Sequence, residues 1–352
     1  MTPVEIRRRL LCWYDRHGRA LPWRRRHTSH YRIWIAEMML IQTQVDTVIP
    51  FYRRFLERFP SVRALAAADL DEVLKLWEGL GYYARARNLH RAARIVCEEH
   101  GGRLPRDPTA LRALPGIGEY VAGAIRSIAF GEPVPAVDGN VRRVLCRLHD
   151  RSQPPASEIH THAAALARGQ RPGDVNQALM DLASGLCRPR SPDCAACPLR
   201  KACLAHRRGT AEVRPRRRES RPRPHHHEIV GVVRRGDGAV LLARRPVEGL
   251  LGGLWEFPSA RRSRKEPTAR AVSRAVEERT GVRCRTGRKL ATLEHAYSHL
   301  GVTLHAYHCT YSGGRLRAQG YQECAWVEPS RLEDLALATA HRRIAETLEV
   351  PR

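Results

Sequence analysis

The chain is 352 residues long and carries a formal net charge of +25, from 61 Lys and Arg against 36 Asp and Glu. This length exceeds one typical domain, and the basic excess favours a polyanionic partner such as nucleic acid. Only four of the basic residues are lysines, so an arginine-rich coding bias is an alternative source of the charge. The N-terminus lacks the apolar stretch of a signal peptide, and no segment is long enough to span a bilayer. We therefore expect a cytoplasmic protein without membrane association, whose cysteines are thiols or metal ligands.

The spacing of apolar residues changes along the chain. Residues 1–205 show helical periodicity in successive segments separated by proline and glycine, which predicts an all-α domain. A basic, proline-bearing stretch at 206–227 is typical of a linker, and its three final histidines suit either a metal site or, more simply, a solvated linker end. Residues 228–352 contain short β-type runs around one helical segment, which predicts a smaller α/β domain.

Glu37 is the single carboxylate in an apolar run, "RIWIAEMMLIQTQV" from Arg32 to Val45. Burying an unpartnered charge is costly, so a carboxylate here should be neutral or paired. Apolar surroundings raise the pKa of a glutamate, which would let Glu37 hold a proton near neutral pH and act as a general acid. The alternative is an ordinary core glutamate paired with an arginine.

Two later stretches add a possible anion site and a second carboxylate. In "LPGIGEYVAGAI" the glycines Gly116 and Gly118 precede a helix, and such glycines can turn backbone N–H groups toward a phosphate. An ordinary helix–turn–helix corner would have the same pattern. Asp138, in "VPAVDGNVRRVL", follows two prolines and opens a helix. It fits an N-cap, and it also fits a carboxylate that faces whatever the hairpin binds.

Four cysteines form one cluster in the sequence, with the spacing C-x6-C-x2-C-x5-C, while the other six are scattered singly. Four thiolates in one short loop suit a tetrahedral zinc ion or a cubane iron–sulfur cluster. Spacing alone leaves both open. The proposed ligands within the loop 187–203 are Cys187, Cys194, Cys197 and Cys203.

Together these stretches resemble the endonuclease III superfamily of helix-hairpin-helix DNA glycosylases and, within it, the MutY-type adenine DNA glycosylases. The matches cover most of residues 20–205 and include "LPWR", "EMMLIQTQVDTVIPFYRRFLERFP", "LWEGLGYYARARNLHRAA", "LPGIGEY", "AVDGNVRRVL", "NQALMDLA" and the cysteine loop. The sequence departs from the family pattern at Ile41-Gln42, where paired glutamines are usual, and at His30, where proline is usual. The resemblance implies a [4Fe-4S] cluster on the four cysteines, with a structural and DNA-contacting role.

The resemblance also implies an activity. It is base excision repair of double-stranded DNA, in which adenine opposite 8-oxoguanine or guanine is flipped out and its N-glycosidic bond hydrolysed by a monomeric enzyme. Glu37 falls on the family's catalytic glutamate and would protonate adenine N7, and ionised Asp138 would stabilise the sugar cation. Asn140 and Tyr120 would orient these groups. Tyr120 stands where bifunctional members carry a lysine nucleophile, which predicts a monofunctional enzyme.

Further contacts follow from the same resemblance. Gly116 and Gly118 would hold a DNA phosphate without reading sequence. Gln42 and Tyr82 would contact the partner strand and intercalate, although a tyrosine at a helix end is often only a packing residue. The residues expected to line the adenine pocket are Leu21, Trp23, Arg24 and Leu40.

The C-terminal part resembles a Nudix fold over 249–282, but its signature is damaged. When the signature is aligned on Gly281, Ala275 and Arg279 replace two of its three Mg²⁺-binding carboxylate residues. Pyrophosphate hydrolysis is therefore not expected. In the family this domain recognises 8-oxoguanine. Its recognition loop resembles "HAYSHLG" at 295–301, where Ser298 and His299 would contact the N7–H that distinguishes 8-oxoguanine from guanine.

Three other functions are weighed against this hypothesis. A glycosylase/lyase acting on oxidised pyrimidines is disfavoured by Tyr120 and by the Nudix-like appendage. A nucleotide pyrophosphohydrolase is disfavoured by Ala275 and Arg279. A non-catalytic DNA-binding protein is disfavoured by the presence of both Glu37 and Asp138.

Overall fold

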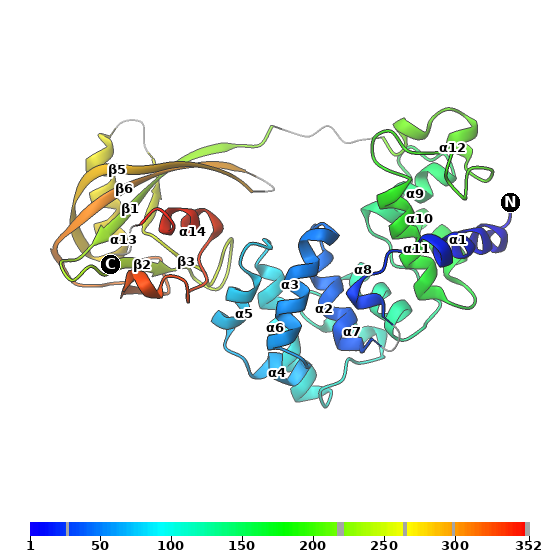
Figure 1. Cartoon of the computed structure of the whole chain (residues 1–352), viewed down its shortest axis with the longest axis horizontal. Coiled ribbons are helices and arrows are strands. Elements are labelled where there is room, and N and C mark those ends of the chain that lie inside the picture. Colours follow the sequence, from blue (N-terminus) through cyan, green and yellow to red (C-terminus); the bar gives the residue numbers. More distant parts are fainter. Residues whose placement is uncertain (26–27, 217–221, 263–265, 298–299, 349–352) are drawn as a thin grey trace. The chain divides into compact units, whose positions relative to one another are not determined.

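The computed structural model describes residues 1–25, 28–216, 222–262, 266–297 and 300–348. The chain divides into two compact units, one formed by Met1–Ala67 with Arg91–Glu219 and the other by Ala68–His90 with Ser220–Arg352. The first unit is helical and the second contains a mixed sheet (Figure 1). The predicted fold class is therefore confirmed. The two units do not follow the chain order, because residues 68–90 group with the second unit. The linear domain ranges 1–205, 206–227 and 228–352 stay a prediction.

Several helices of the first unit begin where the sequence supplies a capping side chain. Thr2 and Glu5 form a capping box at the first helix, and Ser29 accepts a hydrogen bond from the Arg32 amide at the second. The elements are α1 (Pro3–His17), η1 (Pro22–Arg24), α2 (His30–Leu40), α3 (Val45–Arg58), α4 (Val62–Ala67), α6 (Ala84–Glu99, of which the part from 91 belongs to this unit), α7 (Pro108–Ala113), α8 (Glu119–Ala124), the π-helical turn η2 (Ile125–Ala129), α9 (Gly139–Leu148), α10 (Ala156–Ala167), α11 (Pro172–Gly185), α12 (Leu204–Arg207) and η3 (Ala211–Val213).

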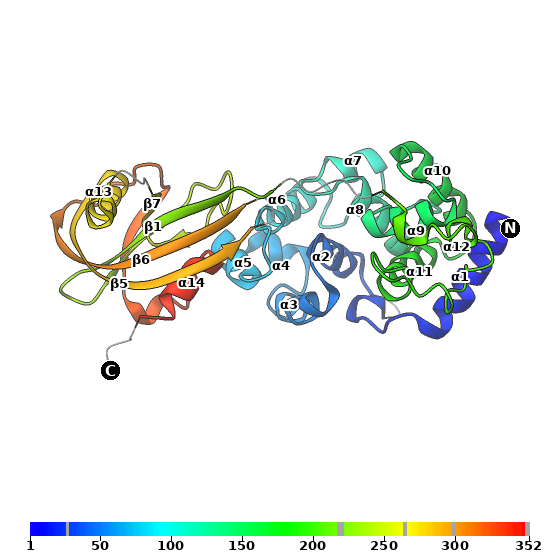
Figure 2. The same cartoon turned by 90° about the horizontal axis from the view of Figure 1, so that it is seen from above.

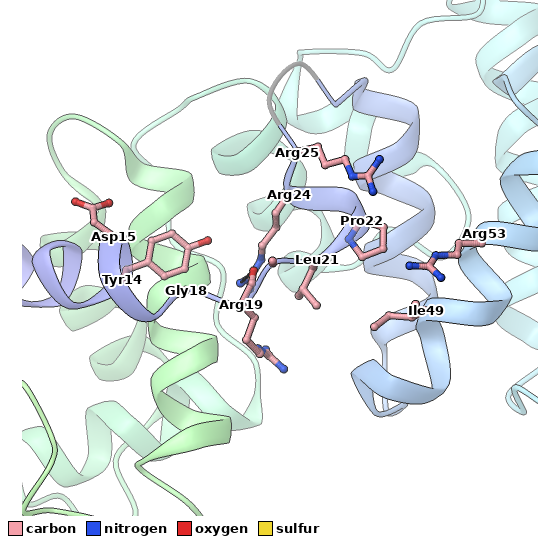
Figure 3. A pocket seen from close by; sticks show the side chains of 11 residues that line it. Tyr14, Asp15, Gly18, Arg19, Leu21, Pro22, Arg24, Arg25, Ile49 and Arg53 are labelled. Carbon is pink, nitrogen blue, oxygen red and sulfur yellow. Dashed lines mark hydrogen bonds between the residues drawn. The ribbon is translucent and has the colours of Figure 1, made fainter.

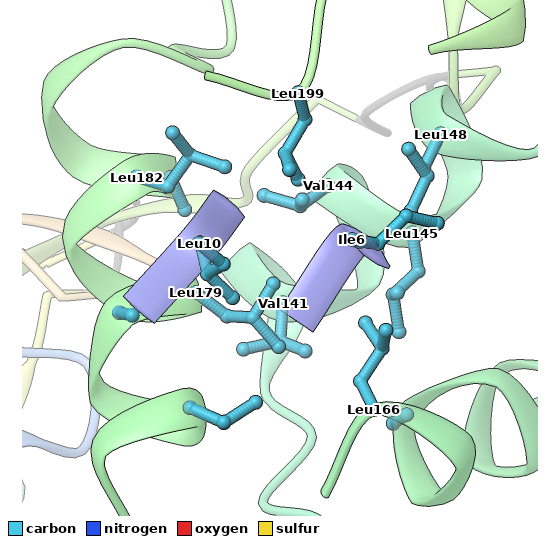
Figure 4. Packing of buried hydrophobic residues seen from close by; sticks show 14 of the residues in the cluster. Ile6, Leu10, Val141, Val144, Leu145, Leu148, Leu166, Leu179, Leu182 and Leu199 are labelled. Atoms are coloured by element: carbon cyan, nitrogen blue, oxygen red, sulfur yellow. The ribbon is translucent and has the colours of Figure 1, made fainter. Parts of the chain in front are cut away.

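Two packing features of this unit place the candidate site. Helices α1, α9, α10 and α11 enclose an apolar cluster (Figure 4) that includes Leu10, Val141, Leu145 and Leu179. Helix α2 is buried at every position from 33 to 39, and Glu37 is the one carboxylate within this buried stretch. Burial of this kind is favourable for apolar side chains and unfavourable for a charged one.

Gly123 lets helix α8 approach the segment that leads into α9. A β-carbon at this position would lie 2.2 Å from the carbonyl oxygen of Pro135, closer than atoms can approach. Any larger residue would push α8 away from the chain three residues before Asp138. The spacing between α8 and the segment that leads to Asp138 therefore depends on glycine at position 123.

The second unit contains a seven-stranded sheet with the order β3-β2-β1-β6-β5, in which β4 pairs with β1 and β7 with β2. Strand β1 is parallel to β6, and β5 is antiparallel to β6. Its elements are α5 (Leu70–Trp77), the start of α6, β1 (His225–Arg234), β2 (Val240–Arg244), β3 (Trp255–Glu256), β4 (Ser259–Arg261), α13 (Thr268–Thr280), β5 (Val282–Ala296), β6 (Gly301–Gly314), β7 (Glu323–Val327), η4 (Pro329–Arg331) and α14 (Thr339–Ala345).

Alternate residues of the central strands pack against different helices. Ile229 and Val233 of β1 lie in one apolar cluster with α13, and Val230 and Val232 lie in another with α14. The unit is therefore a three-layer α/β/α sandwich (Figures 1 and 2). No helix in the described part of the chain is long and apolar enough to cross a membrane.

The three histidines at 225–227 are not the end of a linker. Strand β1 begins at His225, and His225–His227 pair in parallel register with Gly301–Thr303 of β6. The His225 ring nitrogen Nε2 lies 2.8 Å from the Thr303 hydroxyl, and His227 Nδ1 lies 3.3 Å from His305 Nε2. The sequence does not predict this part of the strand, because strands are assigned from alternating apolar residues and these three side chains are polar.

We predict that Gly123→Ala lowers the free energy of unfolding by about 1–3 kcal/mol, because the added methyl group must displace the Pro135 carbonyl. Urea denaturation followed by circular dichroism measures this change. Gly185→Ala at the end of α11 is the matched control, since a β-carbon there meets nothing within 4 Å. Equal stability of the two variants would contradict the tight approach of α8.

Candidate active site

One cavity in the first unit brings the predicted catalytic and adenine-pocket residues together. It has a volume of about 830 Å³, which is large enough for a purine base. It is lined by nine residues singled out from the sequence: Leu21, Trp23, Arg24, Glu37, Leu40, Gln42, Tyr120, Asp138 and Asn140. These residues come from η1, α2, the segment after α2, α8 and the start of α9.

Glu37 lies in the middle of α2 and is 4% exposed. The Tyr120 hydroxyl donates a hydrogen bond to its Oε2 at 2.8 Å. Burial raises the pKa of Glu37 to about 7; the Tyr120 hydrogen bond and the Arg24 charge oppose this rise, and the negative charge of Asp138 adds to it. The side chain can therefore hold a proton near neutral pH and release it within the physiological range.

Asp181 explains why the Arg24 charge does not keep Glu37 ionised. Asp181 was not singled out from the sequence, and its side chain is 2% exposed. It accepts hydrogen bonds from Arg24 at 2.6 and 3.1 Å, and from the Arg19 amide and Nε at 3.0 and 2.7 Å. Burial alone would raise the pKa of Asp181, but the bonds from Arg24 and Arg19 outweigh it and lower the pKa. Both arginines are thereby paired with Asp181, and the Arg24 charge only partly offsets the effect of burial on Glu37.

Asp138 lines the same cavity in a different environment. It is the N-cap of α9, where Oδ1 accepts from the Val141 amide at 2.7 Å and Oδ2 accepts from Asn140 Nδ2 at 2.8 Å. Two donors stabilise a charged carboxylate. The structural and the chemical interpretation of Asp138 are thus compatible, since the capping residue also faces the cavity.

A chain of hydrogen bonds connects this carboxylate to the cysteine loop. The Asn140 side-chain oxygen accepts from Arg143 Nη1 at 3.1 Å. Arg143 in turn donates to the carbonyl oxygens of Cys187 and Ala183, both at 3.0 Å. Arg143 is a positioning residue that sequence inspection missed, because its spacing from Asn140 resembles any exposed helical pair.

Comparison with known proteins identifies the family. Residues 35–168 match the HhH-GPD superfamily of base excision DNA repair proteins, and residues 229–347 match the NUDIX domain. The chain is 34% identical over 407 residues to an adenine DNA glycosylase of Rattus norvegicus, covering 99% of this chain and 78% of the relative. It is 35% identical to an adenine DNA glycosylase of Homo sapiens, covering 95% and 72%. The chain belongs to the adenine DNA glycosylase family. It is therefore an enzyme, a hydrolase that acts on N-glycosyl bonds.

A solved structure agrees with the architecture of the first unit. A thermostable thymine-DNA glycosylase is 29% identical and superposes with a TM-score of 0.54, covering 58% of this chain and 97% of its own. The adenine DNA glycosylase family thus has its helical part in common with glycosylases of other specificity.

The four cysteines of this glycosylase line a second, small cavity together with Arg147. Arg147 is 2% exposed and donates to the Cys187 sulfur at 3.3 Å and to the Cys187 carbonyl at 3.1 Å. Among the described residues it pairs with no carboxylate, so its charge suits an anionic group at the thiols. No three described His, Cys, Asp or Glu side chains are grouped closely enough to hold one metal ion.

The hairpin between α7 and α8 has one glycine in the conformation expected for it. Gly116 has a φ of 81°, in the left-handed region that favours glycine. Gly118 instead has a φ of −80° and is the N-cap of α8, so the positive φ expected of it is not found. Its contact with a DNA phosphate stays a prediction. A β-carbon at Gly118 would meet nothing within 4 Å, so the space outside this backbone is open to a ligand.

A further cavity of about 470 Å³ lies beside the first and has Arg19, Leu21 and Arg24 in common with it (Figure 3). Arg25 and Arg53 also line it (Figure 3). The segment 19–24 therefore forms a wall with a cavity on each side. The Arg24 and Arg19 bonds to Asp181 hold this wall in place.

The remaining predicted contact residues lie in the second unit or outside the described residues. Tyr82 is exposed, with a φ of 50°, in the loop between α5 and α6. Ser298 and His299 lie outside the described residues. In the damaged Nudix signature the side chain of Ala275 is buried, and Glu278 accepts a bond from Arg274 at 2.7 Å.

We predict that Asp181→Asn lowers the pKa of Glu37 below about 7. Removal of the Asp181 charge leaves Arg24 as an uncompensated cation, which favours the ionised form of Glu37. A titration of ¹³C-labelled glutamate by NMR measures the shift. Asp174→Asn is the control on the same helix, because Asp174 pairs with Arg171. An unchanged or raised pKa of Glu37 would show that Asp181 does not direct the charge of Arg24.

Proposed function

We propose that this chain removes adenine mispaired with 8-oxoguanine or guanine from duplex DNA, by hydrolysis of the N-glycosidic bond and without lyase activity. The observation that carries the proposal is the pair of carboxyl groups in one cavity. Glu37 is buried with a pKa of about 7, and Asp138 is held by two hydrogen-bond donors. Carboxyl groups in such different environments suit one acid and one anion.

In this mechanism Glu37 gives its proton to N7 of the flipped adenine. The bond between the sugar C1′ and the base N9 then breaks, and its electron pair leaves with the neutral base. Asp138 stabilises the positive charge on the sugar until the oxygen of water bonds to C1′ and a carboxylate takes up the proton that water releases. Tyr120 and Asn140 keep the two carboxyl groups in position through the bonds that they donate.

Adenine must leave the helix before this chemistry, at a cost of a few kcal/mol. The apolar side chains of Leu21, Trp23 and Leu40 support a site in which a flat base is bound, since all three line the 830 Å³ cavity. Arg24 contributes to the wall while its charge is directed to Asp181. Gln42 and Tyr82 would contact the partner strand, and Gly116 and Gly118 would bind a phosphate.

The environment of Tyr120 supports a monofunctional enzyme. Burial, together with the neighbouring Glu37 and Asp138, raises the pKa of Tyr120 well above its usual value. Its phenol therefore stays protonated and is a poor nucleophile. A Schiff-base lyase step needs an amine, and no lysine stands at this place.

We further propose that Cys187, Cys194, Cys197 and Cys203 hold a [4Fe-4S] cluster. The donor set is all thiol, and the buried Arg147 offers a positive charge beside it. In a cubane cluster each thiolate binds its own iron, which suits sulfurs that face one cavity without surrounding a single point. When bound, the cluster would cross-link the loop, and its flanking basic residues would then face DNA: Arg188, Arg190, Arg200 and Lys201.

The second unit would recognise the base opposite adenine. In place of a Mg²⁺-binding signature it has Ala275 and Arg279, which supports recognition without hydrolysis. Ser298 and His299 would bond the N7–H of 8-oxoguanine. The net charge of +25 supports binding to double-stranded DNA. We further propose that the chain acts as a monomer in the cytoplasm or nucleoid.

We predict that Glu37→Gln lowers the single-turnover rate of adenine excision by about 10²- to 10⁴-fold while mismatch binding is retained, because glutamine cannot donate the proton. Duplexes with 8-oxoguanine:A, G:A and thymine glycol test this function against that of a pyrimidine-specific enzyme. Glu98→Gln at the exposed end of α6 is the control. Excision by Glu37→Gln at the normal rate would refute the assignment.

We predict that Ser298→Ala lowers the ratio of excision rates on 8-oxoguanine:A and G:A by roughly tenfold, the value of one hydrogen bond of about 1–1.5 kcal/mol. The rate on G:A itself should change little. Ser312→Ala, an exposed serine on β6, is the control. Equal losses on both substrates would argue against a recognition role for the 295–301 loop.

A further inference from the structure

Two consecutive tyrosines in the loop between α5 and α6 have opposite environments. Tyr83 is buried; its hydroxyl accepts a hydrogen bond from the Gly79 amide at 3.2 Å and lies 3.5 Å from the Thr339 hydroxyl. Tyr82 is 44% exposed, and its φ of 50° is left-handed. A left-handed backbone is costly for a bulky residue, so contacts around the loop must maintain it.

Helix α5, which leads into this loop, is bound to the sheet side of the second unit. The Arg244 guanidinium of β2 pairs with Asp71 in the first turn of α5. Lys75, one helical turn further on, donates to the Leu335 carbonyl oxygen at 3.4 Å. These contacts explain why residues 68–90 group with the second unit although they lie among the helices of the first in the sequence.

The start of the loop is held by helix α14. Arg342 donates to both carboxylate oxygens of Glu78 at 2.6 and 3.0 Å, and these two side chains are only 17% and 13% exposed. Arg342 also donates to the carbonyl oxygens of Leu332 and Leu335 at 2.7 and 2.6 Å. A guanidinium that bonds both oxygens of a carboxylate fixes its direction as well as its distance. Because Glu78 is the C-cap of α5, this pair fixes the point at which the loop begins.

The end of the loop is held by a glycine turn. Arg87, in the first turn of α6, donates to the carbonyl oxygens of Gly252 and Gly249 at 2.8 and 3.1 Å. A β-carbon at Gly252 would lie 2.1 Å from the Val247 carbonyl oxygen, and Gly249 has a φ of 93°. The turn therefore requires glycine in order to present its carbonyl groups. This "GLLGG" turn belongs to the stretch that resembles a Nudix fold, and here it binds an arginine side chain.

Arg85 supports the Tyr82 ring from within the loop. Its side chain is buried and donates to the carbonyl oxygens of Leu80 and Gly81 at 3.2 and 3.0 Å. The same guanidinium lies 5.5 Å from the centre of the Tyr82 ring, within the range of a cation–π contact. The ring thus lies against a cation whose position is fixed by the loop backbone.

We propose that the second unit positions Tyr82 for insertion into DNA, with Arg342, Glu78 and Arg87 as the positioning residues. They hold the two ends of the loop in the folded protein, so the exposed ring is already in place when DNA binds. A preformed loop avoids the ordering cost that a mobile one would add to binding. The inference rests on the proposed function, in which Tyr82 intercalates and contacts the partner strand. It gives the Nudix-like part of the chain a second task beside recognition of the opposite base.

Binding of full-length variants to a mismatched duplex tests this positioning. The probe carries 2′-fluoro-2′-deoxyadenosine opposite 8-oxoguanine, because the fluorine destabilises the sugar cation and slows excision, and fluorescence anisotropy gives the Kd. Arg342→Glu, Glu78→Arg and Arg87→Ala should each raise the Kd about tenfold, since the loop must then be ordered on binding. The double variant Glu78→Arg/Arg342→Glu restores the pair in reverse and should bind more tightly than either single variant.

The charge changes provide an internal control. Arg342→Glu and Glu78→Arg alter the net charge in opposite directions, so a loss of affinity common to both is not a general electrostatic effect on DNA binding. Arg274→Glu matches the charge change of Arg342→Glu away from the loop, since Arg274 pairs on α13 with Glu266 and Glu278. A Kd of Arg342→Glu no higher than that of Arg274→Glu would overturn the positioning.

A Tyr82→Ala background separates positioning from general damage to the fold. In that background Arg342→Glu should raise the Kd by less than about twofold, because the side chain that the pair positions is gone. A full additional loss there, or a double variant that binds no better than the single ones, would also overturn the positioning. If Tyr82→Ala alone binds as tightly as the unaltered protein, Tyr82 does not contact DNA and the positioning role falls with that contact. Failure of the unaltered protein to excise adenine opposite 8-oxoguanine is a separate result, which refutes the proposed function.

Discussion

The candidate site depends on limiting the effect of nearby cations on one buried carboxyl group. The cavity around Glu37 is lined by Arg19 and Arg24, and the Arg24 charge lowers the pKa of Glu37 less than burial raises it. Asp181 accepts both arginines and is itself almost completely buried. A buried pair of this kind adds little net stability compared with apolar packing. Its value lies in the electrostatic environment that it leaves for Glu37.

The other half of the site depends on backbone geometry rather than charge. Asp138 faces the cavity because it caps α9, and α8 carries Tyr120 close to it because Gly123 permits the approach to Pro135. Arg143 then ties Asn140 to the backbone of the cysteine loop. Any group that holds the cysteine loop in place therefore also steadies the Asp138 carboxylate. If the four cysteines hold the proposed cluster, this chain of bonds is a physical reason for it to stand beside a hydrolytic site.

The sequence predicts the residues of this site whose chemistry conflicts with their surroundings. Glu37 is conspicuous because it is one acid in an apolar run, and the four cysteines because they cluster in one loop. Asp181 gives no such signal. It lies among ordinary helical residues in "NQALMDLA", and its partner Arg19 is 162 residues away. An ion pair over that separation is a property of the tertiary fold. It cannot be predicted from a single sequence.

The secondary structure shows the same limit. Helix α13 is predicted by its apolar spacing and by the glycine that follows it. In the structure this glycine, Gly281, is the C-cap and has a φ of 69°. The start of β1 at His225 is not predictable in this way, because three polar side chains interrupt the apolar pattern. This part of the strand forms by pairing with β6. The grouping of residues 68–90 with the second unit is also invisible locally. It depends on Arg342 and on the carbonyl groups of a glycine turn far along the chain.

Two residues proposed to contact the partner strand have an unusual backbone conformation. Among the described residues only six other than glycine have a positive φ, and two of them are Gln42 and Tyr82. A third, Leu251, lies in the turn that binds Arg87. Such positions cost of order 1–3 kcal/mol each and persist only where surrounding contacts enforce them. If Gln42 and Tyr82 meet the partner strand as proposed, the cost of their left-handed backbone is met in folding rather than in binding.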